Sequence, residues 1–153
     1  MASTFKATLE SVGQSTSRAT VRTHSMLVDR GLAKGGHDRG PSGGEYLMVA
    51  LGGCFTSHLL AAIRARDVVM ENARVEVSGT LDGSPERFVA FTLDVTSECA
   101  DVELARKLVV IAGRGCQIVR TLRQSTPIAI TYAGSPIALD DAVNDAVNDA
   151  VMT

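Results

Sequence analysis

Apolar and polar residues alternate in two stretches near the middle of the chain, residues 73–81 (ARVEVSGTL) and 87–96 (RFVAFTLDVT). Alternation with a period of two is the pattern of a strand that buries one face. Residues 82–85 between them are Asp-Gly-Ser-Pro, which favour a tight turn because their backbone preferences suit it. The pattern therefore predicts a β-hairpin over residues 73–96.

A helical period dominates residues 45–66. The apolar positions of one face recur every three or four residues: Leu47, Leu51, Phe55, Leu59 and Ala62. Apolar residues also occupy the other faces, so the sequence predicts a helix buried on all sides. A single chain of this size would struggle to cover such a helix, and we expect a second subunit to help. Gly52 and Gly53 each cost about 1 kcal/mol in a helix interior, which favours close packing of another backbone or a local irregularity there.

Shorter elements are predicted on both sides. Residues 4–10 and 19–29 have near-strand spacing and flank a turn-like segment at 12–17, which predicts two antiparallel strands. The glycine-rich stretch 31–44 predicts a loop. Further elements are predicted after the hairpin: a helix over 102–113 capped by Ser97 or Asp101, a short helix over 116–124, and a closing strand over 127–132.

The order β-β-α-β-β-α-α-β predicts one α+β domain over residues 1–138, with antiparallel sheets around the long central helix. The tail 139–153 contains DDAVNDAVNDAV, a repeat with a four-residue period. This repeat predicts either an amphipathic helix that buries its Ala-Val pairs against a partner or a frayed chain end.

Composition narrows the functional classes. The formal net charge is −2 and the chain has no Trp, two Tyr and four Phe. Scattered basic residues and few aromatic ones argue against a nucleic-acid partner. The start, MASTFKATLESV, lacks the pattern of a signal peptide. The longest apolar stretches, about a dozen residues, are too short to span a bilayer. We expect a cytoplasmic protein that does not enter membranes.

Three cysteines are the first candidates for chemistry: Cys54, Cys99 and Cys116. Their odd number and wide spacing predict neither a disulfide framework nor a metal site. Cys54, inside an apolar helix, is interpreted most simply as an inert core thiol. Cys116 opens a helix, whose positive end lowers a thiol pKa, although a cap without chemistry is equally compatible. Cys99 is interpreted as incidental.

Two polar residues accompany the Cys54 helix. Glu45 precedes its first turn, where a carboxylate complements the helix dipole. His58 lies four residues after Cys54, so the two side chains share a face. A Cys–His pair can act as nucleophile and base, and a core or interface histidine is the simpler interpretation.

Together, two segments resemble the OsmC/Ohr family. In residues 35–55 (GGHDRGPSGGEYLMVALGGCF), a Gly-Pro-rich loop runs into Glu45, then an apolar helical stretch, then Cys54. The spacing from Glu45 to Cys54 is similar to the broad OsmC-like branch.

The second segment is residues 115–132 (GCQIVRTLRQSTPIAITY), in which Cys116 opens a helix, Leu122 follows six residues later and a strand ends the core. The 62-residue separation of the two cysteines is also similar to the family. One departure is Gln117, because the family commonly has Pro after its second cysteine.

The resemblance implies an OsmC-like fold in an intertwined homodimer, and a thiol peroxidase that reduces organic hydroperoxides, and also hydrogen peroxide, in oxidative-stress defence. Cys54 would be the peroxide-attacking thiolate. Cys116 would be the resolving thiol, forming a disulfide that an external dithiol reduces. The resemblance implies no metal and no organic cofactor.

The resemblance also implies an arginine held by Glu45 beside the Cys54 thiolate. Arg18, expected in the first hairpin turn, is the first candidate, and Arg39, in the glycine-rich loop, is the second. Arg39, Phe55 and His58 are the residues expected to contact the substrate.

Two alternatives stay open. The same fold could sense redox state or bind a small ligand without peroxidase turnover. The protein could also be an interaction protein whose AVND tail docks on a partner. Cysteine Cα atoms within disulfide reach, about 4.4–6.8 Å, and an arginine beside Cys54 would favour the enzyme.

Overall fold

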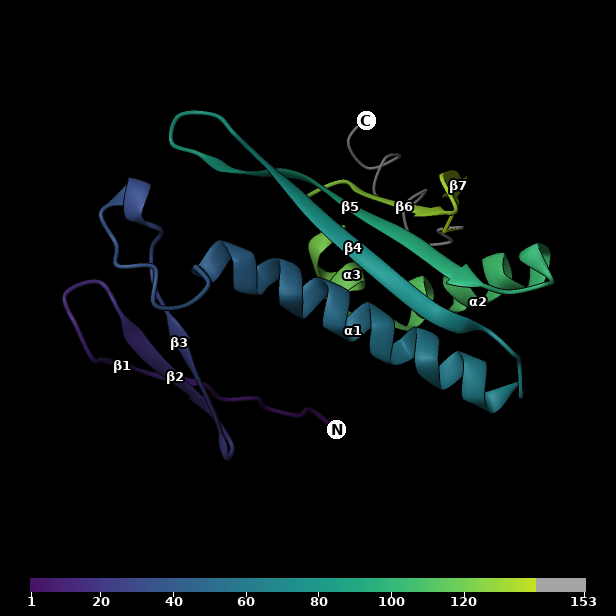
Figure 1. Cartoon of the computed structure of the whole chain (residues 1–153), viewed down its shortest axis with the longest axis horizontal. Helices are drawn as coiled ribbons and strands as arrows, with labels where there is room; N and C mark the ends of the chain where they lie inside the picture. Colours follow the sequence, from purple (N-terminus) through teal and green to yellow (C-terminus); the bar gives the residue numbers. More distant parts are fainter. Residues whose placement is uncertain (140–153) are drawn as a thin grey trace. The chain divides into compact units, whose positions relative to one another are not determined.

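The computed structural model describes residues 1–139, which have the α+β architecture that the sequence predicts (Figure 1). In chain order the elements are β1 (Thr8–Ser11), β2 (Ser17–Val21), β3 (His24–Val28), η1 (Leu32–Lys34), α1 (Gly43–Ala65), β4 (Glu71–Asp82), β5 (Arg87–Glu98), α2 (Val102–Gly115), α3 (Gln117–Leu122), β6 (Ile128–Tyr132) and β7 (Ser135–Ile137). The described residues divide into two compact units, residues 1–49 and the unit that starts at Ala50. The predicted single domain over 1–138 stays a prediction, and the predictions for the repeat at 140–151 lie outside the described residues.

The first unit contains a three-stranded antiparallel sheet in the order β1-β2-β3. The prediction of a single strand over 19–29 is wrong, because the chain reverses at Arg22 and Thr23. Arg22 has a φ of 55°, in the left-handed region that a strand cannot continue through. Arg18 therefore lies within β2, opposite Leu27 of β3, and not in the hairpin turn.

Asp29 follows β3 and fixes the glycine-rich loop through hydrogen bonds. The residue is only 3% exposed. Its carboxylate accepts hydrogen bonds from Thr16 Oγ1 at 3.0 Å and from the backbone N–H groups of Arg30 at 2.8 Å and Arg39 at 3.2 Å. Burial raises the pKa of Asp29, but hydrogen bonds from Ser15, Arg39, Arg30 and Thr16 outweigh it and hold the pKa well below its usual range. The buried carboxylate thus organises a segment that has no apolar period.

Two glycines let this loop pass close to its own backbone. A Cβ at Gly36 would lie 1.9 Å from the carbonyl oxygen of Arg30, and one at Gly40 would lie 2.3 Å from that of Leu27. The loop is shorter and less irregular than predicted, because it contains the 3-10 turn η1 and ends where α1 begins at Gly43.

The second unit contains a four-stranded sheet in the order β4-β5-β6-β7. The predicted hairpin is confirmed, with β4 antiparallel to β5. The β5–β6 pair is parallel, which differs from the predicted antiparallel sheets. Two helices between these strands return the chain to the same end of the sheet, as a parallel pair requires. Strand β7 is an additional antiparallel edge strand.

The helices of this unit cover one face of its sheet. The register aligns one residue from each strand: Val77, Leu93, Ile130 and Ile137. Aligned residues point to the same face. A Cβ at Gly52 of α1 would lie 2.8 Å from Val77, and one at Gly113 of α2 would lie 3.3 Å from Ile130. Figure 1 accordingly shows α1 running alongside β4 and β5.

Within one chain helix α1 is buried along one face only, so its predicted burial on all sides, with the help of a second subunit, stays a prediction. Its buried residues form a single stripe: Leu51, Phe55, Leu59 and Ala62. Leu60 is 44% exposed. Among the described residues, no atom other than those of the two chain neighbours and the helix's own backbone lies within 4 Å of a Cβ built at Gly53. The close packing expected at the glycines is therefore found at Gly52 and not at Gly53.

The sequence predicted that no apolar stretch is long enough to span a bilayer, and the length of α1 corrects this expectation. With 23 residues and a mean hydropathy of 1.6, it is long and apolar enough to cross a membrane by length and composition. A mostly buried core helix of a soluble protein passes the same test, whereas 28% of the tested window of α1 is buried within the described residues.

Candidate active site

Cys54 lies in the middle of α1 and is half-buried. Its thiol donates a hydrogen bond to the side-chain carbonyl oxygen of Gln117, at 3.3 Å from Sγ to Oε1. Gln117 is the first residue of α3 and is exposed. Cys54 is thus a thiol that solvent reaches and that contacts the start of another helix.

Cys116 lies at the junction of α2 and α3, where it ends one helix and caps the next. Its backbone is extended, with φ −69° and ψ 114°. Its sulfur accepts a hydrogen bond from the backbone N–H of Val119 at 3.4 Å, in the manner of an N-cap side chain. The side chain is fully buried. The prediction that Cys116 opens a helix is confirmed, with the helix proper starting one residue later.

The expected lowering of the Cys116 pKa is wrong. Burial raises the pKa of this thiol to about 11, because the thiolate loses its hydration. The hydrogen bond from the Val119 N–H lowers the pKa but is too weak to compensate, and the neighbouring Cys54 thiol raises it further through a hydrogen bond and through charge. Burial of Cys116 therefore favours its neutral thiol over its thiolate.

His58 joins this cluster through Gln117. Its Nε2 lies 3.1 Å from Gln117 Oε1, the same oxygen that accepts from Cys54. On its other side, Nδ1 faces Gly115, where a Cβ would lie only 2.9 Å away. The glycine before Cys116 therefore makes room for the imidazole. Cys54, Cys116 and His58 are brought together, and Gln117 is the residue that the sequence did not assign to the site.

Glu45 caps the N-terminus of α1 together with Ser42. Its carboxylate accepts from the backbone N–H of Ser42 at 2.6 Å, and its own N–H donates to Ser42 Oγ at 3.3 Å, which is a capping box. The backbone hydrogen bond from Ser42, and then the side-chain one, lower the pKa of Glu45. The Ser-x-x-Glu spacing at 42–45 could have shown this in the sequence. The predicted hold of Glu45 on an arginine stays a prediction.

The remaining predicted residues are placed as follows. Arg18 is an exposed residue of β2, and Arg39 is an exposed loop residue whose backbone N–H binds Asp29. Phe55 is fully buried among the core residues of α1, so its side chain serves packing. The roles predicted for these three residues stay predictions.

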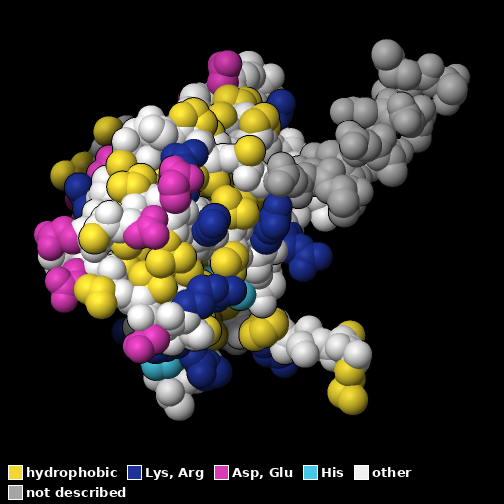
Figure 2. Space-filling view, turned by 90° about the vertical axis from the view of Figure 1, so that its right-hand side faces the viewer, with side chains coloured by type: hydrophobic (Ala, Val, Ile, Leu, Met, Phe, Trp, Pro, Cys, Tyr) yellow, Lys and Arg dark blue, Asp and Glu magenta, His cyan; other side chains and the backbone are white. Residues whose placement is uncertain are grey.

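Cys99 lies between β5 and α2, where its thiol donates to the backbone oxygen of Asp101 at 3.3 Å. Within residues 1–139, no group of three or more His, Cys, Asp or Glu side chains is placed to hold a metal ion. On the face shown in Figure 2, apolar side chains are interspersed with Lys and Arg side chains rather than separated from them.

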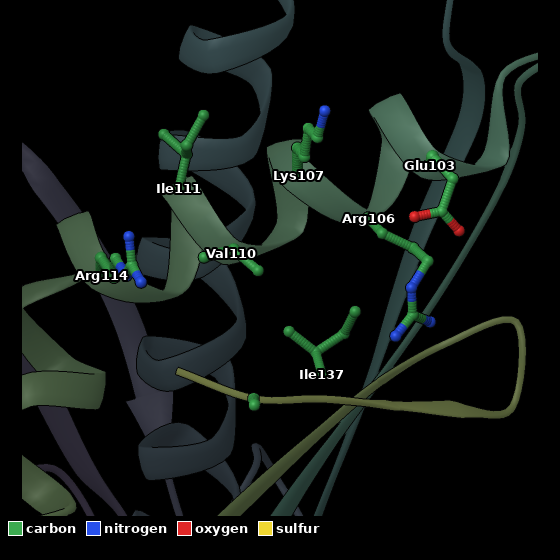
Figure 3. A pocket seen from close by; sticks show the side chains of 8 residues that line it. Glu103, Arg106, Lys107, Val110, Ile111, Arg114 and Ile137 are labelled. Carbon is green, nitrogen blue, oxygen red and sulfur yellow. The ribbon is translucent and has the colours of Figure 1, made fainter. Parts of the chain in front are cut away.

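A groove of about 420 Å³ lies between α2 and β7 (Figure 3). Its apolar lining includes Val110, Ile111 and Ile137, and Arg106 and Lys107 contribute basic side chains. Neither Cys54 nor Cys116 lines it. The groove is therefore separate from the thiol cluster.

Comparison with known proteins identifies the relationship. The family model of OsmC-like proteins matches residues 36–131, more than half of the chain. No curated protein matches. An OsmC-like protein from Mycoplasma pneumoniae is 14% identical with a TM-score of 0.74, over 86% of this chain and 99% of that one.

Two further solved structures are named organic hydroperoxide resistance proteins. The one from Elizabethkingia anophelis is 16% identical with a TM-score of 0.69, over 86% of this chain and 96% of that one. The one from Legionella pneumophila is 14% identical with a TM-score of 0.68, over 86% and 98%. At such identities the structures show a shared fold, and with the match of the family model they establish that this chain belongs to the OsmC-like protein family.

Proposed function

We propose that the protein is a thiol peroxidase that reduces organic hydroperoxides, and also hydrogen peroxide, with Cys54 and Cys116. One observation carries the proposal: the half-buried Cys54 thiol on α1 bonds to Gln117, the residue that directly follows the fully buried Cys116 at the α2–α3 junction, although the two cysteines are 62 residues apart in the sequence. The names of the Legionella and Elizabethkingia proteins, which share the fold, support the choice of substrate class.

The reaction divides between the two thiols according to their exposure. The Cys54 thiolate attacks one peroxide oxygen, so that an S–O bond forms, the O–O bond breaks and the alcohol leaves with a proton, giving a sulfenic acid. The Cys116 sulfur then attacks the Cys54 sulfur, and the sulfenic hydroxyl leaves as water with the Cys116 proton. An external dithiol reduces the resulting disulfide to two thiols. A buried Cys116 is protected from peroxide until Cys54 has reacted.

The proposal includes the residues implied by the family resemblance. An arginine, Arg18 or Arg39, stabilises the Cys54 thiolate and polarises the peroxide while Glu45 orients it. The site forms in a homodimer, for which the exposed Gly53, Ser57, Leu60 and Ala61 of α1 provide an uncovered surface with apolar and small side chains. We place the protein in the cytoplasm, where dithiol reductants keep its cysteines reduced.

The decisive experiment follows consumption of cumene hydroperoxide in the presence of dithiothreitol, with mass spectrometry of the cysteines. We expect turnover and a Cys54–Cys116 disulfide when the reductant is limiting. Cys54→Ser should lower turnover by at least 100-fold. Cys116→Ser should consume about one equivalent of peroxide and then stall or over-oxidise. Cys99→Ser is the matched control and should retain wild-type turnover.

Full turnover by Cys54→Ser would contradict the mechanism. No turnover by the wild type, with both thiols left reduced, would contradict the peroxidase function and favour a ligand-binding or regulatory member of the same fold.

A further inference from the structure

One side-chain oxygen connects Cys54 with His58. Oε1 of Gln117 lies 3.3 Å from the Cys54 sulfur and 3.1 Å from His58 Nε2. An amide oxygen has two lone pairs and accepts both hydrogen bonds when the thiol is protonated and Nε2 carries the imidazole proton. This arrangement suits the resting thiol but not the thiolate, because a carbonyl oxygen facing a negative sulfur repels it.

The thiolate requires a hydrogen-bond donor, and the NH₂ group of the same Gln117 side chain is one. The amide has the same shape after a 180° turn, which exchanges its oxygen for an NH₂ group with two donors. One N–H would then point to the Cys54 sulfur and the other to His58 Nε2. Neutral imidazole accepts there in its second tautomer, in which Nδ1 carries the proton.

We propose that Gln117 is a positioning residue that stabilises Cys54 in both protonation states, accepting from its thiol as observed and donating to its thiolate after the amide turns over, with His58 bonded to the amide throughout. The hydrogen bond to a charged sulfur is stronger than the one to the neutral thiol. Gln117 therefore favours ionisation of Cys54 and raises its reactivity.

The surroundings of His58 support its proposed hydrogen bond to the Gln117 amide in both orientations. The imidazole lies between Gln117 on its Nε2 side and Gly115 on its Nδ1 side, and the missing side chain of Gly115 leaves room for the ring beside the amide. The residues before and after Cys116 thus both face the imidazole. The sequence Gly115-Cys116-Gln117 supplies the second thiol together with both contacts.

The test measures alkylation of Cys54 by iodoacetamide, resolved by peptide mass spectrometry, from pH 5 to pH 10 on the full chain. Two titratable groups lie near Cys54, namely Cys116 at the α2–α3 junction and His58 on α1, and the uncharged Val77 of β4 lies opposite Gly52. The key variant is Gln117→Leu, and Gln124→Leu, at an exposed glutamine just after α3, is the matched control.

We expect Gln117→Leu to move the profile up by about one pH unit, which is a tenfold change in the ionisation equilibrium. The alkylation rate at pH 7 should fall by about threefold, because a less acidic thiolate is also more nucleophilic. The plateau rate at high pH should rise about threefold for the same reason. Gln124→Leu should leave the profile in place. Gly115→Ala, which displaces the imidazole, should move the profile in the same direction by a smaller amount.

A rate at pH 7 for Gln117→Leu equal to or above that of the wild type would overturn the proposal, because the amide would then serve only as an acceptor that holds the thiol proton. A lower plateau without a shifted profile would also overturn it, by indicating a disturbed structure. The inference rests on the proposed function only for the identity of Cys54 as the attacking thiol. Alkylation needs no peroxide, so a shifted profile in a protein without peroxidase turnover would leave this inference standing while the proposed function fails.

Discussion

The unit of residues 1–49 is organised around a buried carboxylate, whereas the unit that starts at Ala50 is organised around an apolar core. Among the described residues, the first unit buries a single apolar side chain, that of Ala19, and closes its loop with the hydrogen bonds of Asp29. The second buries apolar side chains from α1, α2 and all strands but β4. The difference shows that polar contacts determine the shape of a glycine-rich loop without apolar periodicity. Burial of apolar side chains determines the shape of the second unit.

The largest expected effect comes from the apolar unit. Phe55→Ala should lower the free energy of unfolding by about 3–5 kcal/mol, because it removes a large, fully buried side chain and leaves a cavity. Urea unfolding followed by circular dichroism measures the change. Leu81→Ala, at a 46% exposed position of β4, is the control and should change stability little. A stable Phe55→Ala protein with weakened peroxide turnover would instead support the predicted contact of Phe55 with the substrate.

Asp29→Asn addresses the polar unit and should have a smaller, pH-dependent effect. The pKa of Asp29 in the folded protein lies below its usual value, so its stabilising contribution is present above about pH 4, the value of an unfolded aspartate, and is lost as the pH falls toward the folded value. The variant should be less stable than the wild type at pH 7, and the difference should shrink below pH 4. Urea unfolding at pH 7, 5, 4 and 3 measures this. A difference that stays constant down to pH 3 would contradict the assigned ionisation.

The contrast between the units also explains how far the sequence could predict the fold. Periodicity predicted the hairpin of β4 and β5 and the helices α1 and α2, because burial of one face dictates both the pattern and the structure. It missed the chain reversal at Arg22, because a positive φ at a non-glycine residue has no clear signature in a single sequence. Periodicity also missed the role of Asp29 in organising the loop. Hydrogen bonds between residues ten or more positions apart produce no periodic pattern in the sequence.

The candidate site was predictable to a similar degree. Residue type and spacing made Cys54, Cys116 and His58 candidates, and the roles of the two cysteines were implied by the resemblance to the OsmC/Ohr family. The structure brings the three residues together. The raised pKa of Cys116 was not predictable, since local sequence indicates a helix start but not the burial that outweighs it. Gln117 was visible only as a departure from the family pattern, because its contacts to Cys54 and His58 span 63 and 59 residues of sequence.

The smallest expected effect comes from Asp101, a carboxylate of the second unit that can be compared with Asp29 of the first. Asp101 is exposed and caps α2 by accepting from the N–H of Leu104 at 2.9 Å, so it makes one such bond where Asp29 makes several. Asp101→Ala should lower the free energy of unfolding by about 1 kcal/mol, as loss of an N-cap does, while Asp101→Asn should be nearly neutral because asparagine caps equally well. Urea unfolding of both variants at pH 7 measures the pair. Equal losses in both would show that Asp101 stabilises the protein through its charge rather than through the cap, and the distinction between a capping carboxylate in one unit and an organising carboxylate in the other would then fail.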